Sequence, residues 1–74
     1  MAFHSDYVIL ITFTNGEKGY FNSMVRGDIV CCEYPASAKL YSTIEEAQYD
    51  IRHFLNPDDC VSGTEIKLYD ALFL

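Results

Sequence analysis

The side chains that could bind a metal ion or act as nucleophiles are few, and their spacing does not favour a site. The candidates are three cysteines and two histidines: Cys31, Cys32, Cys60, His4 and His53. Cys31 and Cys32 are neighbours on an expected strand, so their side chains point to opposite faces and do not readily share one zinc ion. We expect free thiols and no metal ion, with one of this pair in the core and the other facing whatever covers the sheet.

Catalytic motifs are also missing from the sequence. His53 could serve as a general base only beside a nucleophile or an acid, and it is expected on the polar side of a helix. We find no glycine-rich phosphate loop and no Gly-x-Ser-x-Gly elbow, and Asn56, Asp58 and Asp59 lack the spacing of a calcium-binding loop. We therefore expect no catalytic residues, no cofactor and no enzymatic activity.

Arg26-Gly27-Asp28 matches an integrin-binding motif, but a three-residue match arises easily by chance. The same residues suit a tight turn between two strands, and we interpret them as a turn. Integrin binding would require an extracellular protein. An odd number of cysteines, two of them adjacent, is instead typical of a reducing compartment.

Length and charge limit the class of protein and of partner. We expect a single domain over residues 1–74 because the chain is short, and we expect it to fold because half of its residues are hydrophobic. The formal net charge of −6 disfavours direct binding to a nucleic-acid backbone and favours a basic or non-acidic protein partner. Without a signal-peptide pattern or an apolar run of roughly 20 residues, the expected location is the cytoplasm, with no membrane partner.

The best-defined element is an amphipathic helix over residues 43–55. Its start is marked by a capping box, formed either by Thr43 with Glu46 or by Ser42 with Glu45, and an Asn-Pro pair ends it. When successive residues are placed one hundred degrees apart around the helix axis, the apolar side chains lie on one stripe. The expected inner stripe is Ile44, Ala47, Ile51, Phe54 and Leu55.

Three segments before the helix predict an antiparallel meander, because they are rich in β-branched and aromatic residues and are separated by turn residues. The expected strands are residues 7–14, 18–25 and 29–34. If Asn15-Gly16 is a two-residue type I′ turn, Ile11 lies opposite Tyr20, and Leu10 lies opposite Phe21.

A fourth strand is expected over residues 64–72, where Ile66, Leu68 and Leu72 alternate with polar residues. The first strand is apolar on both faces and belongs in the centre of the sheet, with the fourth beside it and parallel to it after a right-handed crossover. The predicted fold is α+β: a four-stranded mixed sheet (β-β-β-α-β) in the order 3-2-1-4, with one helix packed on one face.

One helix covers one face of such a sheet, yet Val8, Leu10 and Phe21 are expected on the other face. The cover could be the apolar C-terminal residues, a second copy of the chain or a target protein. We favour a homodimer. The residues expected to mediate self-association are Val8, Leu10, Phe21, Leu72, Phe73 and Leu74.

The outer side of the helix is a candidate binding surface for a basic partner, because an exposed tyrosine among acidic residues suits protein recognition. The expected partner-binding residues are Glu45, Glu46, Tyr49, Asp50, Asp58 and Asp59. Two plainer alternatives are that Tyr49 stacks on a neighbour one turn away, and that the charges form an ordinary solvated face. The surface could also mimic nucleic acid in a binding groove of another protein.

The segment over residues 38–47, AKLYSTIEEA, resembles a pattern found in small bacteriophage and prophage proteins. In these proteins an opening β-hairpin is followed by Ala-Lys, an aromatic residue, Thr, and then Glu-Glu-Ala at the start of the single helix. The phage pattern often has a tryptophan on the strand before Ala-Lys, where this chain would have to use Tyr34. Small acidic phage proteins include anti-CRISPR inhibitors of host defence, but the resemblance assigns no function to individual residues.

The resemblance, the acidity and the missing catalytic motifs lead to one functional expectation. The chain is expected to be a phage-type binding protein that inhibits a host defence or nucleic-acid-processing complex by occupying a protein surface, within the host cytoplasm. The alternative is a self-associating structural module without enzymatic activity.

Overall fold

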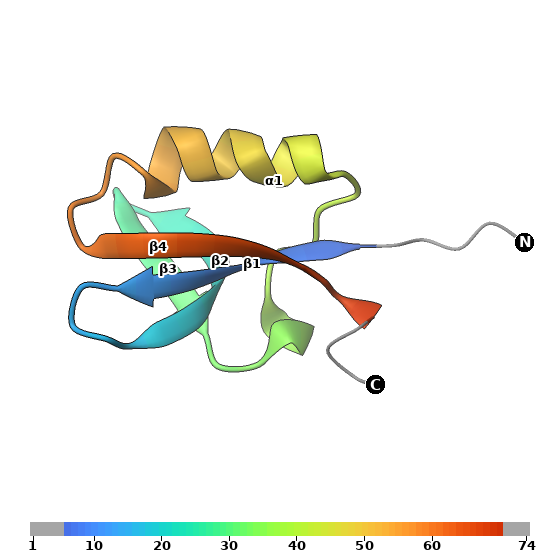
Figure 1. Cartoon of the computed structure of the whole chain (residues 1–74), viewed down its shortest axis with the longest axis horizontal. Coiled ribbons are helices and arrows are strands. Elements are labelled where there is room, and N and C mark those ends of the chain that lie inside the picture. The colour runs from blue at the N-terminus through green and yellow to red at the C-terminus, as the bar shows by residue number, and fades with distance from the viewer. Residues whose placement is uncertain (1–5, 71–74) are drawn as a thin grey trace, which may run out of the picture.

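Four strands form one antiparallel sheet, and a single helix lies on one of its faces (Figure 1). The computed structural model describes residues 6–70. The elements are β1 (Tyr7–Phe13), β2 (Lys18–Val25), β3 (Asp28–Cys32), α1 (Ile44–Asp50), which continues as a π-helical turn (Ile51–Leu55), and β4 (Val61–Leu68). The order β3-β2-β1-β4 confirms the predicted strand order and the α+β class.

The direction of β4 corrects the prediction of a mixed sheet, because β4 runs antiparallel to β1. After β3 the chain passes through a short 3-10 helix, Pro35–Ser37, and returns to the start of β1. There Tyr7 and Tyr41 exchange two backbone hydrogen bonds of 2.8 and 2.9 Å. The helix therefore starts beside the first residue of β1, and β4 begins at the other end, opposite Phe13.

The turn between β1 and β2 is one residue longer than predicted. The Phe13 amide donates to the Glu17 carbonyl at 2.8 Å, and Gly16, with φ of 89°, occupies the left-handed position of a three-residue loop. This register pairs Ile11 with Gly19 rather than with Tyr20. A slip of one residue moves a side chain to the other face, so Phe21 lies on the helix side of the sheet.

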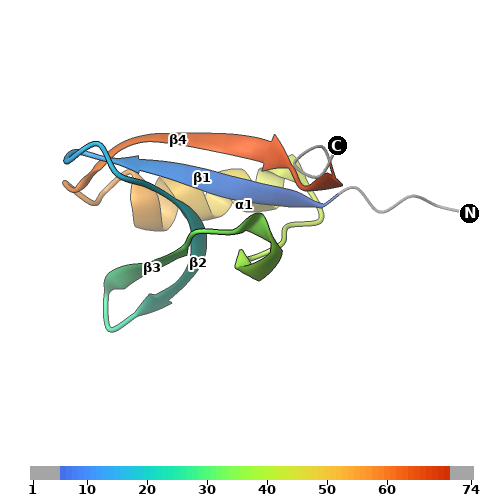
Figure 2. The same ribbon diagram turned by 90° about the horizontal axis from the view of Figure 1, so that it is seen from below.

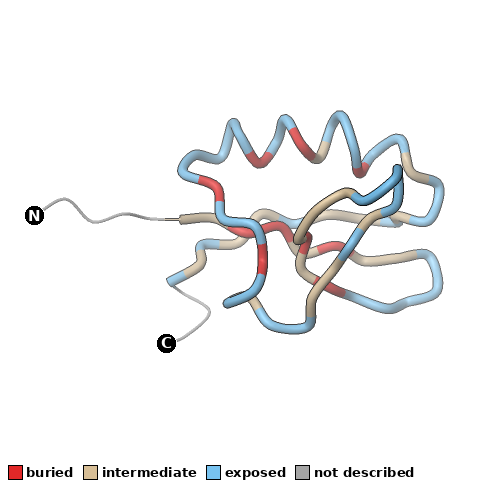
Figure 3. The backbone as a smooth tube through the Cα atoms, turned by 180° about the vertical axis from the view of Figure 1, so that it is seen from behind, coloured by how far each residue is buried: buried red, intermediate tan, exposed pale blue. Residues whose placement is uncertain are grey.

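The hydrophobic core lies between α1 and this face of the sheet, as the buried segments in Figure 3 show. Its fully packed members come from β1, β2, the segment before the helix, and the helix itself. They are Ile9, Ile11, Phe21, Tyr41, Ala47 and Leu55.

The helix stripe differs from the predicted stripe at its two ends. Ala47 and Leu55 are buried, but Ile44 and Phe54 are each 42% exposed. The Asn56 amide bonds to the Ile51 carbonyl at 2.7 Å, five residues back, and this wider π-helical turn shifts the direction of the last side chains.

The expected self-association surface does not form as predicted. Val8 is 0% exposed and Phe21 is 2% exposed, so neither side chain is available to a partner. Leu10 is half-buried beside Tyr20 and Glu65. The 3-10 helix Pro35–Ser37 lies on the side of the sheet opposite α1 (Figure 1). Leu72, Phe73 and Leu74 lie outside the described residues.

Candidate functional site

A groove of about 450 Å³ runs between α1 and the segment that leads into it. Tyr41 is fixed by its bridge to Tyr7, and Thr43 fixes the start of the helix by accepting a hydrogen bond from the Glu46 amide at 3.2 Å. Of the two predicted caps, Thr43 is therefore the observed one. The groove is lined by Lys39, Leu40, Tyr41, Glu45, Glu46, Tyr49 and Asp50.

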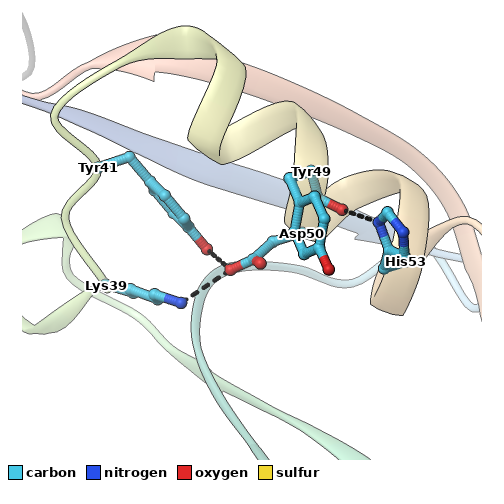
Figure 4. Close-up of polar contacts among 5 residues, drawn as sticks. All are labelled: Lys39, Tyr41, Tyr49, Asp50 and His53. Carbon is cyan, nitrogen blue, oxygen red and sulfur yellow. Dashed lines mark hydrogen bonds and ion pairs between the residues drawn. The ribbon is translucent and has the colours of Figure 1, made fainter.

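The inner end of the groove is a hydrogen-bonded cluster of three side chains (Figure 4). The Tyr41 hydroxyl donates to Asp50 Oδ2 at 2.6 Å, and Lys39 Nζ donates to the same oxygen at 2.8 Å. Lys39 Nζ also lies 5.1 Å from the centre of the Tyr41 ring. Asp50 is 7% exposed and Tyr41 2% exposed, whereas the Lys39 side chain is 48% exposed, so the cluster is open to water only on the Lys39 side.

The cluster changes the acidity of two of its members. Burial alone would raise the pKa of Asp50, but hydrogen bonds from Lys39 and Tyr41, together with the charges of Lys39 and His53, outweigh it and lower that pKa. Burial and the hydrogen bond to the charged Asp50 raise the pKa of the Tyr41 hydroxyl. Asp50 is therefore ionised and Tyr41 protonated at neutral pH, an arrangement that stabilises the fold.

The position of Asp50 corrects the prediction that it belongs to the exposed acidic surface. Its carboxylate points into the protein, because Tyr41 and Lys39 supply the donors that a buried carboxylate needs. Glu45 and Glu46 are exposed on α1, as predicted. The Glu46 carboxylate also accepts a 3.3 Å hydrogen bond from the Thr43 hydroxyl, whereas the Glu45 carboxylate forms no hydrogen bond or ion pair with the described residues.

Tyr49 forms the outer aromatic part of the groove and is 57% exposed. It stacks on His53, with ring centres 3.9 Å apart and an angle of 23° between the planes. His53 Nδ1 lies 2.8 Å from the Tyr49 carbonyl, which can only accept, so this nitrogen carries the proton (Figure 4). Stacking on a neighbour one turn away, one of the two plainer alternatives for Tyr49, is confirmed.

Asp58 and Asp59 lie beyond the helix end and do not line the groove. The Asp58 carboxylate accepts a hydrogen bond from the Cys60 amide at 2.8 Å, which shapes the turn into β4, and Asp59 is exposed. The groove therefore brings together four of the six predicted binding residues: Glu45, Glu46 and Tyr49 at its exposed rim, and Asp50 at its buried end.

The three cysteines are free thiols. Cys31 packs against the core, where burial and the neighbouring Cys32 raise the pKa of its thiol, and Cys32 Sγ donates to the Tyr34 carbonyl at 3.3 Å. Among residues 6–70, no three His, Cys, Asp or Glu side chains gather in a metal-binding arrangement. Within that same range, no helix has the length and apolar character needed to cross a membrane.

The groove residues that sequence reasoning missed are Lys39, Leu40 and Tyr41. The sequence signal for Leu40 and Tyr41 is their place just before the helix, where side chains can pack near its first turn. The contact between Tyr41 and Asp50 depends on the return of the chain to β1, which the sequence pattern did not predict. No family model, curated protein or solved structure matches the chain, so the chemistry of the groove is interpreted from its own residues.

Proposed function

We propose that this chain is a non-enzymatic binding protein, and that the groove beside α1 receives a basic side chain of a protein partner. The observation that carries the proposal is the placement of Glu45 and Glu46 beside the exposed ring of Tyr49 on a groove of about 450 Å³. Lys39 lines the same groove, but its charge is engaged by Asp50. The carboxylates of Glu45 and Glu46 are left to attract a cation.

The chemistry of the rim suits arginine or lysine. A guanidinium or ammonium group over the ring of Tyr49 gains cation–π attraction, and a carboxylate at the same rim adds a charge-assisted hydrogen bond. His53 holds the Tyr49 ring in place by stacking, which reduces the ordering that binding would require.

We further propose that the partner is a surface of a host protein or ribonucleoprotein complex, which the chain inhibits by occupying it in the host cytoplasm. The net charge of −6 and the phage-like segment over residues 38–47 support this proposal. Electrostatic attraction between the acidic rim and a basic surface would speed association and weaken with added salt.

The groove is tested by NMR titration of the labelled protein with a peptide of alternating arginine and glycine residues. The expected result is shifted amide signals at Leu40, Glu45 and Tyr49, with binding about 5-fold weaker for Tyr49→Ala, the loss of one cation–π contact of about 1 kcal/mol. Glu45→Gln should also weaken peptide binding, whereas the matched control Glu17→Gln, in the exposed β1–β2 turn, should bind like wild type. Equal shifts with a peptide carrying glutamate in place of arginine would contradict the proposal.

The inhibitor role is tested with a bacterial lysate at low salt. The wild-type chain should retain a stoichiometric partner that Glu45→Lys and Tyr49→Ala each release and that Glu17→Lys retains. Recovery of no such partner, or of one that ignores all three substitutions, would count against the role.

A further inference from the structure

Among residues 6–70, no strand pairs with the outer edge of β4, which lies apart from the groove. β4 is the last strand of the sheet, and in Figure 2 it forms one margin of the molecule with α1 set back behind β1. The Tyr69 amide donates to the Asp6 carbonyl at 2.8 Å. In an antiparallel pair every second residue bonds to the partner strand, so this bond shows which residues of β4 bond to β1. The backbone groups of Glu65 and Lys67 therefore bond to β1, and those of Thr64, Ile66 and Leu68 point outward.

The two edges of the sheet differ in how they are protected. β3 at the opposite edge has five residues and lies beside a bulge in β2 between Phe21 and Ser23, a distortion that discourages pairing with another chain. β4 has eight residues, and its register with β1 shifts only at the far end, between Thr12 and Phe13. No described backbone group bonds to the outward amides and carbonyls of Thr64, Ile66 and Leu68.

The charges on β4 are arranged in a self-complementary way. Glu65 and Lys67 lie on the same face of the strand and form an ion pair of 2.9 Å. If two copies of β4 pair antiparallel about Ile66, Glu65 of each copy lies opposite Lys67 of the other. The outward groups of Ile66 then bond to each other, and those of Thr64 bond to those of Leu68. The register that matches the charges is thus also a register in which the free hydrogen-bonding groups meet.

The apolar side of the edge fits the same arrangement. Leu68 is 39% exposed and Ile66 is half-buried, and both lie on the helix side of the sheet, opposite Tyr7 and Ile9. Pairing about Ile66 would place the two Ile66 side chains together and cover both. α1 packs on β1, and the β1 strands of the two copies would be three strand spacings apart, about 14 Å. This separation exceeds the roughly 8–10 Å between the axes of packed helices, so the two α1 helices would not collide.

We propose that the β4 edge is a self-association surface, through which two copies of this chain form a continuous eight-stranded sheet centred on Ile66. This replaces the predicted self-association surface of Val8, Leu10 and Phe21, whose members lie on different faces of the sheet. The buried area of such an edge pairing is small, so the dimer should be weak and should form only as the protein concentration rises.

The test is a charge exchange followed by sedimentation velocity. Glu65→Lys places two lysines opposite each other at both ends of the pairing, and Lys67→Glu does the same with two glutamates, so each variant should dimerise about 10-fold more weakly than wild type. An equimolar mixture of these two variants should restore the dimer, because every lysine then faces a glutamate. Glu17→Lys makes the same charge change away from the edge and should dimerise like wild type.

Circular dichroism checks that each variant is folded, and hydrogen exchange locates the interface. The Ile66 amide should become protected as the wild-type concentration rises. The proposal is overturned if wild type stays monomeric at millimolar concentration, if Glu65→Lys behaves like Glu17→Lys, if the mixture fails to associate, or if protection appears at β3 instead.

Discussion

Asp50 and Glu45 are both acidic residues of one short helix, yet they have opposite environments. Asp50 is 7% exposed and its carboxylate accepts hydrogen bonds from Tyr41 and Lys39, whereas Glu45 is exposed and its carboxylate forms no hydrogen bond or ion pair with the described residues. The same kind of charge thus stabilises the fold at one end of the groove and is available to a ligand at the other.

This difference shows that the charge pattern of a helix does not by itself identify a binding surface. A carboxylate that is withdrawn from water needs donors from elsewhere in the chain, and here Tyr41 and Lys39 provide them from the segment bridged to β1. An acidic residue without such donors remains at the surface and keeps its attraction for a cation.

The strongest test of the comparison is Asp50→Ala. It leaves the buried Tyr41 hydroxyl without its acceptor, so we expect a loss of about 3 kcal/mol in the free energy of unfolding, measured by urea denaturation. Glu45→Ala should change that value by less than about 0.5 kcal/mol. Adding Tyr41→Phe to Asp50→Ala should recover about 1 kcal/mol, because it removes the unpaired hydroxyl. Equal losses for Asp50→Ala and Glu45→Ala would remove the distinction between the two environments.

The next test uses pH. The pKa of Asp50 in the folded protein lies below its unfolded value of about 3.9, so the ionised carboxylate stabilises the fold above that pH. This stabilisation is lost as the pH falls through the folded pKa. Thermal unfolding between neutral pH and strong acid should therefore show a smaller acid-induced decline for Asp50→Asn than for wild type, with Glu45→Gln resembling wild type. Parallel curves for all three proteins would show that Asp50 is not the responsible group.

A smaller effect is expected at the helix start, which positions both acidic sites. Thr43→Ala removes the acceptor for the Glu46 amide and should cost about 1 kcal/mol in urea denaturation. Thr43→Ser keeps the hydroxyl and should retain most of the stability. If Thr43→Ala and Ser42→Ala lower the free energy of unfolding equally, Thr43 is not the residue that caps the helix.

The smallest effect on stability is expected at the outer rim. Tyr49→Ala removes an exposed ring that stacks on His53, so the free energy of unfolding should fall by less than about 1 kcal/mol. Tyr49→Ala should nevertheless weaken the binding of the arginine-glycine peptide about 5-fold. A large loss of stability without any change in peptide binding would assign Tyr49 to the structure rather than to recognition.

Local chemistry in the sequence determined much of this protein. The amphipathic helix, a cap at Ser42 or Thr43 and the strand content follow from periodicity and turn residues, which act over a few neighbouring positions. The order 3-2-1-4 followed from the apolar character of both faces of the first strand, which places that strand in the centre of the sheet. The exposure of Glu45, Glu46 and Tyr49 also followed from the pattern of the helix.

Tertiary structure decided the rest, because it depends on contacts between residues far apart in the chain. The direction of β4 is set by the bridge between Tyr7 and Tyr41, and the face of Phe21 by a loop one residue longer than predicted. The burial of Asp50 likewise required the donors of Tyr41 and Lys39, nine and eleven residues away. The periodicity of the helix does not depend on those partners, so it predicts the same exposure for Asp50 as for Glu45 and Glu46. Only the fold places the donors beside the Asp50 carboxylate.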